Sequence, residues 1–237
     1  MHRLGLEHPH SAAGSGQDTR HRFAATGDPE PRLNILALLR GLIGKELTAV
    51  SLPCTMNEPL SQVQRALGFV AYADLLDRAA RTADEAERAA CIIAPYYMSL
   101  CDTYARRRKP FNALLGETFE LVVGEVRALS EQVCASPSIT AYHLESPAFF
   151  LEATYRGSVQ ASLTRGIVVN TSCDARFVIK ATGEEFRFEF PQPHLRSVLT
   201  GSISIYFKGH YRAFSTRSGA TAVLRFPAKT PEPGREL

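Results

Sequence analysis

The chain has 237 residues, of which 45% are apolar and 22% are charged, and its formal net charge at pH 7 is +3. These values are ordinary for a globular protein, and the length alone fits one large domain or two small ones. So small a net charge excludes wholesale nucleic-acid binding, which leaves basic contacts to local clusters. One such cluster is Arg106-Arg107-Arg108-Lys109.

The cysteines and the N-terminus indicate in which cellular compartment the protein is expected. The five cysteines are scattered, and they include no CxxC pair or other metal-ligand spacing. We therefore expect reduced thiols, no metal site and no cofactor. The N-terminus lacks the apolar core of a signal peptide, and no apolar run is long enough to span a bilayer. We expect a cytoplasmic protein that touches membranes only peripherally.

Both ends of the chain are rich in residues that oppose folding. Residues 1–31 include Gly14-Ser15-Gly16 and Pro29-Glu30-Pro31, and they predict a flexible leader. Residues 229–237, with Pro231-Glu232-Pro233-Gly234, predict a flexible tail. A single domain over residues 32–228 remains between them.

The first segment of that domain, residues 33–43, is apolar around most of a helix. Such a helix must be covered by other parts of the protein. Its apolar pattern fits an ordinary core helix and a lid over a ligand equally well. The following Leu52-Pro53 ends any helix and favours an extended connection.

Residues 61–105 predict two helices, each opened by a capping box in which a hydroxyl residue precedes Glu or Gln by three positions. The first box is Ser61 with Gln64, and its helix extends to about Arg81. The second is Thr82 with Glu85, and its helix extends to about Tyr104, where the internal Pro95 favours a kink.

Residues 118–226 predict antiparallel strands, because apolar and polar residues alternate there. Residues 185–190 place three phenylalanines on one face and charged side chains on the other. Further strands are predicted at Phe149–Tyr155, Val159–Val169, Ala175–Lys180, Ile203–Phe207, Tyr211–Ser215 and Thr221–Phe226. The chain is thus of the α+β class, with a helical N-terminal part followed by a large antiparallel β-meander.

Glycine-containing turns at 181–184 and 217–220 predict hairpins. We expect the carboxylates of Glu184 and Glu185, in or beside the first turn, to face solvent. If the apolar strand face closes on itself, it forms a barrel, complete or open, that encloses a cavity or must be plugged. A ligand cavity covered by the helix at 33–43 accounts for both features.

Signatures of catalysis are missing from the sequence. We find no GxSxG elbow, no GxxxxGK[ST] phosphate loop, no GxGxxG after a strand and no HExxH. His143 lies in the extended stretch that follows residues 131–138 and is interpreted as structural. We do not expect an enzyme.

Three stretches of the chain resemble the lipid-binding domain of the oxysterol-binding protein family. The first runs from Ile43-Gly44-Lys45-Glu46-Leu47 through Asn57-Glu58-Pro59-Leu60-Ser61 to Ala80 and is most similar to the sterol-binding branch. The second, KPFNALLGETFE at residues 109–120, is close to the family block KPFNPLLGETFE. The third, EQVCASPS at residues 131–138, occupies the place of the family signature EQVSHHPP.

This resemblance implies a lipid-binding β-barrel and assigns roles to particular residues. It implies that Lys109 and Asn112 contact a lipid phosphate, for which an ammonium and an amide are suitable donors. From composition alone, a solvated lysine and a turn asparagine are the commoner interpretation. The resemblance also implies that residues 33–43 form a lid, in which the apolar side chains are Leu36, Leu39, Leu42 and Ile43.

The chain departs from the family signature where the paired histidines belong. The degenerate signature consists of Glu131, Gln132, Val133, Ala135, Ser136 and Pro137, with Ala135 and Ser136 at the histidine positions. Neither side chain can donate a hydrogen bond from a positively charged group, as a histidine can. Each lost charge-assisted hydrogen bond is worth about 1.5–3 kcal/mol. We therefore expect weak binding of phosphatidylinositol 4-phosphate.

Two functional hypotheses follow. The first is a cytosolic lipid-binding and lipid-transfer protein that encloses a membrane lipid, with a sterol favoured, and contacts membranes transiently. The second is a shortened, non-transferring interaction module that has lost the phosphoinositide headgroup site. Neither hypothesis involves nucleic acid, and the sequence does not indicate a protein partner.

Overall fold

The computed structural model describes residues 54, 57–104, 108–162, 166–196 and 204–226. The chain divides into two compact units, residues 1–33 and 34–237, and all the described residues belong to the second. The leader, the tail and the segment 33–43 lie outside the described residues, so the fold below concerns the helical part after residue 53 and the strands.

The first predicted helix, from residue 61 to about Arg81, is broken into three pieces. The pieces are α2 (Gln62–Ala66), the 3₁₀ helix η3 (Gly68–Tyr72) and α3 (Ala73–Arg81). The backbone N–H of Ser61 donates to Gln64 Oε1 at 2.8 Å, so Gln64 caps the start as expected. Leu67 then departs from helical geometry beside Gly68, a poor helix former, and Val70 N–H donates to the Leu67 carbonyl in a tighter turn. The prediction of one continuous helix was wrong.

Helix α4 (Glu85–Tyr104) runs through Pro95 as a single helix. Its N-cap is Asp84, whose Oδ1 accepts hydrogen bonds from the backbone N–H groups of Ala86 at 2.8 Å and Glu87 at 3.1 Å. The predicted box of Thr82 with Glu85 was therefore misplaced by two residues. An aspartate side chain at this position satisfies the same unpaired N–H groups and complements the helix dipole.

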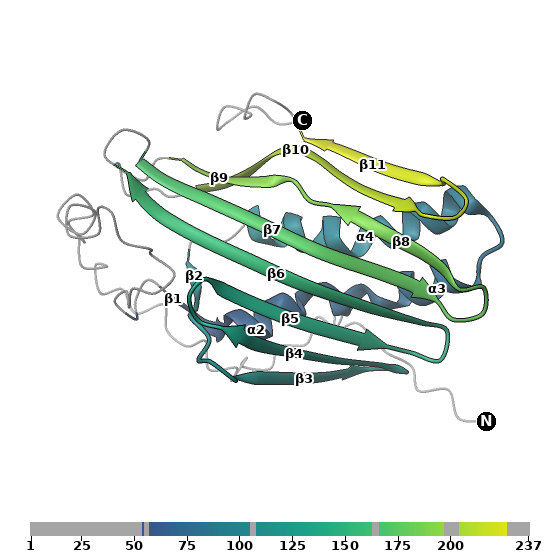
Figure 1. The fold of residues 1–237 in the computed structure, drawn as a ribbon, viewed down its shortest axis with the longest axis horizontal. Coiled ribbons are helices and arrows are strands. Elements are labelled where there is room, and N and C mark those ends of the chain that lie inside the picture. The colour runs from purple at the N-terminus through teal and green to yellow at the C-terminus, as the bar shows by residue number, and fades with distance from the viewer. Residues whose placement is uncertain (1–53, 55–56, 105–107, 163–165, 197–203, 227–237) are drawn as a thin grey trace, which may run out of the picture. The chain divides into compact units, whose positions relative to one another are not determined.

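Most of the described strands form one antiparallel sheet (Figure 1). Its order is β11-β10-β8-β7-β6-β5-β4-β3, and β9 pairs with β10. The strands are β3 (Thr118–Val123), β4 (Val126–Cys134), β5 (Ser138–Glu145), β6 (Phe149–Ser162), β7 (Gly166–Ile179), β8 (Glu184–Glu189), β9 (Gln192–Arg196), β10 (Ser204–Ser215) and β11 (Thr221–Phe226). A second, parallel pair joins β1 (Asn57–Ser61) to β2 (Lys109–Phe111).

The meander and its hairpin turns confirm the predicted α+β class. Gly183 and Gly219 adopt φ values of 68° and 77°, which a residue with a side chain rarely does, so glycine suits both turns. Two predicted strand boundaries were wrong. Residues 159–169 are shared between β6 and β7, and the strands predicted at 203–207 and 211–215 are one strand, β10.

The sheet is open within the described part of the chain. Its strand order is linear, and β3 and β11 stand at opposite ends without pairing to each other. The barrel expected from the sequence is thus present as a long curved sheet that does not close on itself.

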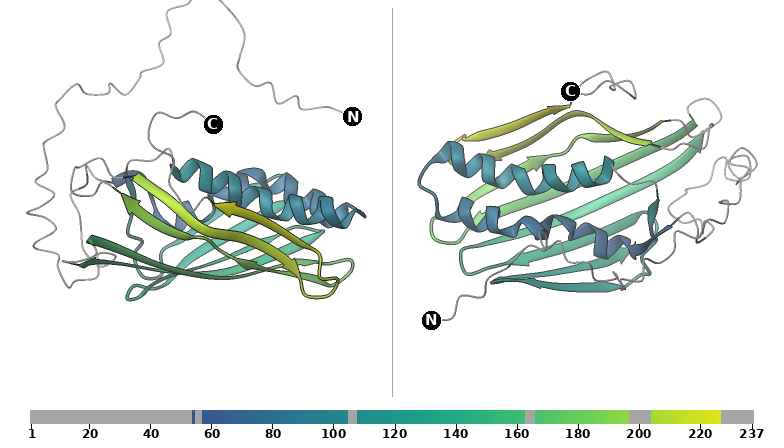
Figure 2. Two further views of the ribbon diagram at one scale, coloured as in Figure 1. Left: turned by 90° about the horizontal axis from the view of Figure 1, so that it is seen from above. Right: turned by 180° about the vertical axis from the view of Figure 1, so that it is seen from behind.

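The helices cover one face of this sheet (Figure 2). Phe186 and Phe188 of β8 are buried on that face. The Phe188 ring lies 5.5 Å from the Tyr96 ring of α4, and Tyr96 in turn stacks on Phe69 at 4.4 Å. These two phenylalanines therefore pack against the chain's own helices and do not line an empty cavity.

One buried ion pair fastens α4 to the β7–β8 hairpin. Arg88 Nη1 lies 3.0 Å from Glu184 Oε2, and both side chains are largely buried. The other carboxylate oxygen, Glu184 Oε1, accepts hydrogen bonds from Ser215 Oγ at 2.7 Å and Ser218 Oγ at 3.0 Å. Glu184 therefore does not face solvent as expected, because the arginine of a distant helix reaches it.

Replacing Glu184 with alanine should lower the free energy of unfolding by about 3 kcal/mol, because it leaves the Arg88 charge buried without its partner. The matched control is Glu145→Ala, which removes the exposed pair of Glu145 with Lys180 and should cost less than about 1 kcal/mol. Urea unfolding of both variants measures the difference. Equal losses would contradict the proposed role of the buried pair.

Candidate functional site

Lys109 and Asn112, the residues expected at a lipid phosphate, contact each other. Lys109 Nζ donates to Asn112 Oδ1 at 2.8 Å and to the Pro110 carbonyl at 3.0 Å. That carbonyl also accepts from Asn57 Nδ2 at 3.1 Å, and Asn57 pairs with Lys109 across β1 and β2. The small parallel sheet thus brings the first two family-like stretches together.

The Lys109 ammonium is half-buried, and burial lowers its pKa from the ordinary lysine value. The lowered pKa means that folding disfavours the charged form. A negatively charged oxygen placed nearby would offset that cost.

The turn after Asn112 joins the second family-like stretch to the third. Gly116 N–H donates to the Gln132 carbonyl at 2.9 Å, and Gln132 N–H donates to the Glu117 carbonyl at 3.0 Å. These two bonds extend the β3–β4 ladder toward Lys109. The three stretches, far apart in sequence, therefore meet at one end of the sheet.

The degenerate signature forms the end of β4 and the turn into β5. Glu131 and Val133 point away from the helices and are exposed, whereas Gln132 between them is buried. Gln132 Nε2 donates to the Cys134 carbonyl at 2.7 Å and to Ser138 Oγ at 3.0 Å, and Thr140 Oγ1 donates to Gln132 Oε1 at 2.8 Å. Gln132 thus fixes the turn, a role that the sequence alone did not reveal.

Ala135, Ser136 and Pro137 form that turn, and all three are exposed. At the two positions where the family signature has histidines, the turn carries a methyl group and a hydroxyl. Among the other predicted residues, Arg108 is exposed, while Arg106, Arg107 and the lid residues Leu36, Leu39, Leu42 and Ile43 lie outside the described residues.

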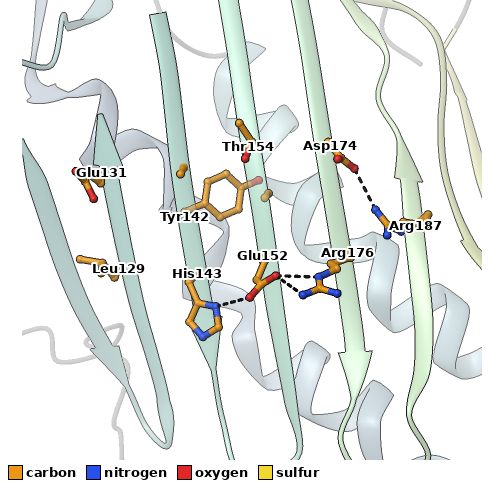
Figure 3. Close-up of a pocket in the computed structure, with 11 residues that line it drawn as sticks. Leu129, Glu131, Tyr142, His143, Glu152, Thr154, Asp174, Arg176 and Arg187 are labelled. Carbon is orange, nitrogen blue, oxygen red and sulfur yellow. Dashed lines mark hydrogen bonds and ion pairs between the residues drawn. The ribbon is translucent and has the colours of Figure 1, made fainter. Parts of the chain in front are cut away.

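A hollow of about 540 Å³ lies on the opposite, polar face of the sheet (Figure 3). Arg176 Nε donates to Glu152 Oε2 at 2.8 Å, and His143 Nδ1 lies 3.5 Å from Glu152 Oε1. Arg187 Nη1 donates to Asp174 Oδ1 at 3.2 Å. Sequence reasoning missed this hollow, because only the cross-strand register of β5 to β8 brings these residues together.

Each of the two arginines of this hollow, Arg176 and Arg187, is paired with a carboxylate that also lines it. The Glu152 carboxylate, through its hydrogen bond and its charge, raises the pKa of Arg176. The described residues contain no group of three or more His, Cys, Asp or Glu side chains arranged to hold a metal ion. Such half-exposed ion pairs are typical of a solvated sheet face, and we assign no ligand to the hollow.

The face toward the helices ends in an apolar region that is only partly buried. We call it the inner strip, and it consists of Tyr155, Cys173, Phe190, Leu224 and Phe226. Tyr155 pairs with Cys173 across β6 and β7, and Leu224 pairs with the buried Tyr211 across β11 and β10. Burial raises the pKa of Tyr155 and of Cys173 to about 12, so both groups are neutral at physiological pH.

Tyr211 lies at the border between the filled core and the inner strip. Its ring is 5.2 Å from Phe190 and 5.6 Å from Tyr96. Its hydroxyl is buried and has no hydrogen-bond partner within the described residues. A buried hydroxyl without a partner costs about 1–3 kcal/mol, so this group is unusual for a core.

Comparison with known proteins identifies the family. The model of the family described as oxysterol-binding protein matches residues 34–234. The chain belongs to the oxysterol-binding protein family. Oxysterol-binding protein-related protein 1 of Homo sapiens is 29% identical over 198 residues, which cover 81% of this chain and 21% of that protein. Oxysterol-binding protein homolog 2 of Saccharomyces cerevisiae is 39% identical over 130 residues, 54% of this chain and 10% of that protein.

Solved structures of the family share the fold. The Osh1 ORD domain in complex with cholesterol matches with a TM-score of 0.71 and 28% identity, over 81% of this chain and 47% of that chain. The Osh3 ORD of Saccharomyces cerevisiae in complex with PI(4)P matches with a TM-score of 0.74 and 28% identity, over 86% and 55%. The chain thus spans about half the length of these family domains and about a fifth of the human relative.

Within the described part of the chain, none of the helices is both long and apolar enough to cross a bilayer.

Replacing Lys109 with methionine should leave the free energy of unfolding at pH 7 unchanged or raise it, because folding lowers the pKa of this ammonium and so disfavours its charge. The benefit should shrink as the pH rises through the lowered pKa of Lys109 in the folded state toward the ordinary lysine pKa of about 10.4, above which the residue is neutral in both states. Urea unfolding at neutral and alkaline pH tests both statements.

The matched control is Lys180→Met. Lys180 Nζ donates to Glu145 Oε1 at 2.6 Å and to the Ser146 carbonyl at 2.8 Å, so this change should lower stability slightly. A Lys109→Met protein that loses more stability than Lys180→Met would show that Lys109 has a structural role instead.

Proposed function

We propose that the protein binds a sterol, or a membrane lipid of similar shape with a single hydroxyl, at the inner strip and transfers it between membranes. Membership of the oxysterol-binding protein family supports this proposal, as do the related domains whose structures contain cholesterol and ergosterol. Under this proposal the protein acts in the cytoplasm and contacts membrane surfaces transiently. It carries a bound lipid and catalyses no reaction.

The single observation that carries the choice of lipid is the buried hydroxyl of Tyr211. It lies beside apolar side chains that are only partly buried, and it lacks a hydrogen-bond partner among the described residues. A lipid whose surface is apolar except for one hydroxyl would cover the inner strip and supply the missing partner. A lipid that buries about 500 Å² of apolar surface in the protein is stabilised by about 12 kcal/mol relative to water. Most of this free energy replaces contacts that the lipid already had in the bilayer.

A phosphoinositide is the weaker candidate. A related domain is known in complex with PI(4)P, and the adjacent Lys109 and Asn112 would supply hydrogen-bond donors for a phosphate here. The turn at Ala135 and Ser136, however, offers no cationic donor. Losing two charge-assisted hydrogen bonds weakens binding by several powers of ten, at about 1.4 kcal/mol for each tenfold step. The lid role of residues 33–43 rests on the sequence alone.

The proposal is tested by incubating the protein with liposomes that carry labelled sterol, phosphatidylserine or phosphatidylinositol 4-phosphate. Sterol should be extracted, and the phosphoinositide should not. Extraction of no lipid would contradict the proposal and would support the alternative, an interaction module that keeps the scaffold and has lost lipid transfer.

The Tyr211→Phe variant should separate lipid binding from stability. Without lipid, its free energy of unfolding should be unchanged or higher by up to about 1 kcal/mol, because the unpaired hydroxyl is gone. Its affinity for sterol should fall about tenfold with the loss of one hydrogen bond. Tyr97→Phe, at an exposed tyrosine of helix α4, serves as control and should change the affinity for sterol little. Unaltered sterol affinity in Tyr211→Phe would rule out the assignment of its hydroxyl.

A further inference from the structure

The strands β9, β10 and β11, at the end of the sheet opposite β3, contain no Asp or Glu (Figure 1). Their described side chains include three cations, Lys208, Arg212 and Arg225, and two histidines, His194 and His210. The whole chain, in contrast, has 27 Lys or Arg residues and 24 Asp or Glu residues. These three strands therefore carry a local excess of positive charge.

The three cations lie on the face of the sheet that is turned away from the helices. Tyr211 of β10 is buried against α4 on the inner face. Because successive side chains of a strand alternate between faces, its neighbours His210 and Arg212 point outward, and so does Lys208. Arg225 of β11 pairs in register with His210 and shares its face. We call Lys208, Arg212 and Arg225 the cationic row.

Two aromatic rings on the same face hold cations of the row along β10. Lys208 Nζ lies 5.5 Å from the centre of the Tyr206 ring, and the guanidinium carbon of Arg212 lies 4.6 Å from the centre of the Phe214 ring. Such cation–π contacts favour one arrangement of an otherwise flexible side chain. The cationic row is therefore partly ordered before any partner binds, which lowers the entropy cost of binding.

One carboxylate, Glu189 of β8, contacts the row. Its Oε1 lies 3.2 Å from Arg212 Nη1, and its Oε2 lies 2.8 Å from His210 Nε2. These contacts lower the pKa of Glu189, with the hydrogen bond to His210 as the largest cause. Neither Lys208 nor Arg225 forms an ion pair with another residue that the structure describes. Two of the three cations thus remain for a partner.

We propose that the cationic row binds an extended acidic segment of a partner protein. Lys208, His210 and Arg212 follow one another at every second position, about 7 Å apart along the strand. An extended peptide repeats the side chains of one side at the same interval, so alternating carboxylates would each meet a donor. None of these residues lines the hollow of Figure 3, and a chain laid along an open face needs no pocket.

Two other occupants fit the row less well. A membrane on the outer face would lie on the side of the sheet opposite the inner strip, where we propose that the lipid binds, so this contact would not serve lipid exchange. Residues 227–237 of the chain carry two basic and two acidic side chains and therefore do not complement a positive surface. The inference goes beyond lipid binding and does not depend on it.

A fluorescein-labelled peptide of four Glu-Thr repeats is the probe, and a peptide of four Gln-Thr repeats is its uncharged control. Fluorescence anisotropy measures the binding of each peptide to the full chain. The glutamate peptide should bind, and more weakly as salt is added, whereas the glutamine peptide should not. Equal binding of the two peptides, or binding of neither, overturns the proposal.

The triple variant Lys208→Gln, Arg212→Gln and Arg225→Gln should bind the glutamate peptide at least about tenfold more weakly, because the donors of the row are gone. The charge-matched control replaces three exposed cations elsewhere and consists of Arg81→Gln, Arg127→Gln and Lys180→Gln. It should lose much less affinity. Equal losses in the two triple variants would mean that net charge, and not the row, attracts the peptide.

The single variant Arg225→Gln keeps the test independent of folding. Arg225 is exposed and has no ion-pair partner among the described residues, so its replacement should leave thermal unfolding unchanged. The affinity for the glutamate peptide should still fall by about threefold. Unchanged peptide binding in this variant, with the triple variant unfolded, overturns the proposal.

Vesicles and sterol distinguish this proposal from its alternatives. The row's triple variant should sediment with phosphatidylcholine vesicles containing phosphatidylserine as the unmodified protein does. Loss of vesicle binding together with intact peptide binding would make a membrane the occupant and overturn the proposal. Protein loaded with sterol from cyclodextrin should bind the glutamate peptide as the sterol-free protein does, because the two sites lie on opposite faces. Failure of sterol uptake would contradict the lipid-binding function alone.

Discussion

The packing of helix α4 on the inner face of the sheet determines where anything else can bind. Antiparallel strands with strict alternation produce one apolar face, and that face must be covered. Tyr96 of α4 lies among Phe69, Phe188, Phe190 and Tyr211, and Arg88 at the other end of the helix pairs with Glu184. The helix therefore converts most of the apolar face into an ordinary core. What remains is the partly buried inner strip beyond it, and the lipid-binding proposal depends on that strip.

The end of the sheet where the three family-like stretches meet is organised mainly by backbone hydrogen bonds. Asn57, Gly116 and Gln132 make the contacts that bring β1, β2 and β4 together. The side chains that this frame exposes are of two kinds, the cations Arg108 and Lys109 and the apolar pair Leu114 and Leu115. This frame places Lys109, for which we propose a lipid phosphate contact, beside the two exposed leucines.

Much of the fold followed from the sequence. The alternation at 185–190 predicted which side chains of that stretch face the helices, and the glycines at 183 and 219 predicted both hairpins. The family motifs led to the shared end of the sheet, because local sequence patterns define local structure.

Long-range partners could not be predicted in the same way. The burial of Glu184 depends on Arg88, almost a hundred residues earlier, and a carboxylate beside a turn gives no local sign of that arginine. The hollow around Glu152 and Arg176 likewise requires the register of four strands. Most importantly, an apolar strand face carries the same sequence signature whether a helix or a guest lipid covers it. The filling of the space at Phe186 and Phe188 was therefore visible only in the structure.

Photo-crosslinking with a diazirine-bearing sterol, followed by peptide mapping, tests the central claim most directly. Adducts on β6, β7, β10 or β11 at the inner strip and around Tyr211 are the predicted result, and unlabelled sterol should compete them away. Adducts confined to the outer face, at residues such as Leu129 or Val223, or the absence of any competable adduct, would contradict the account.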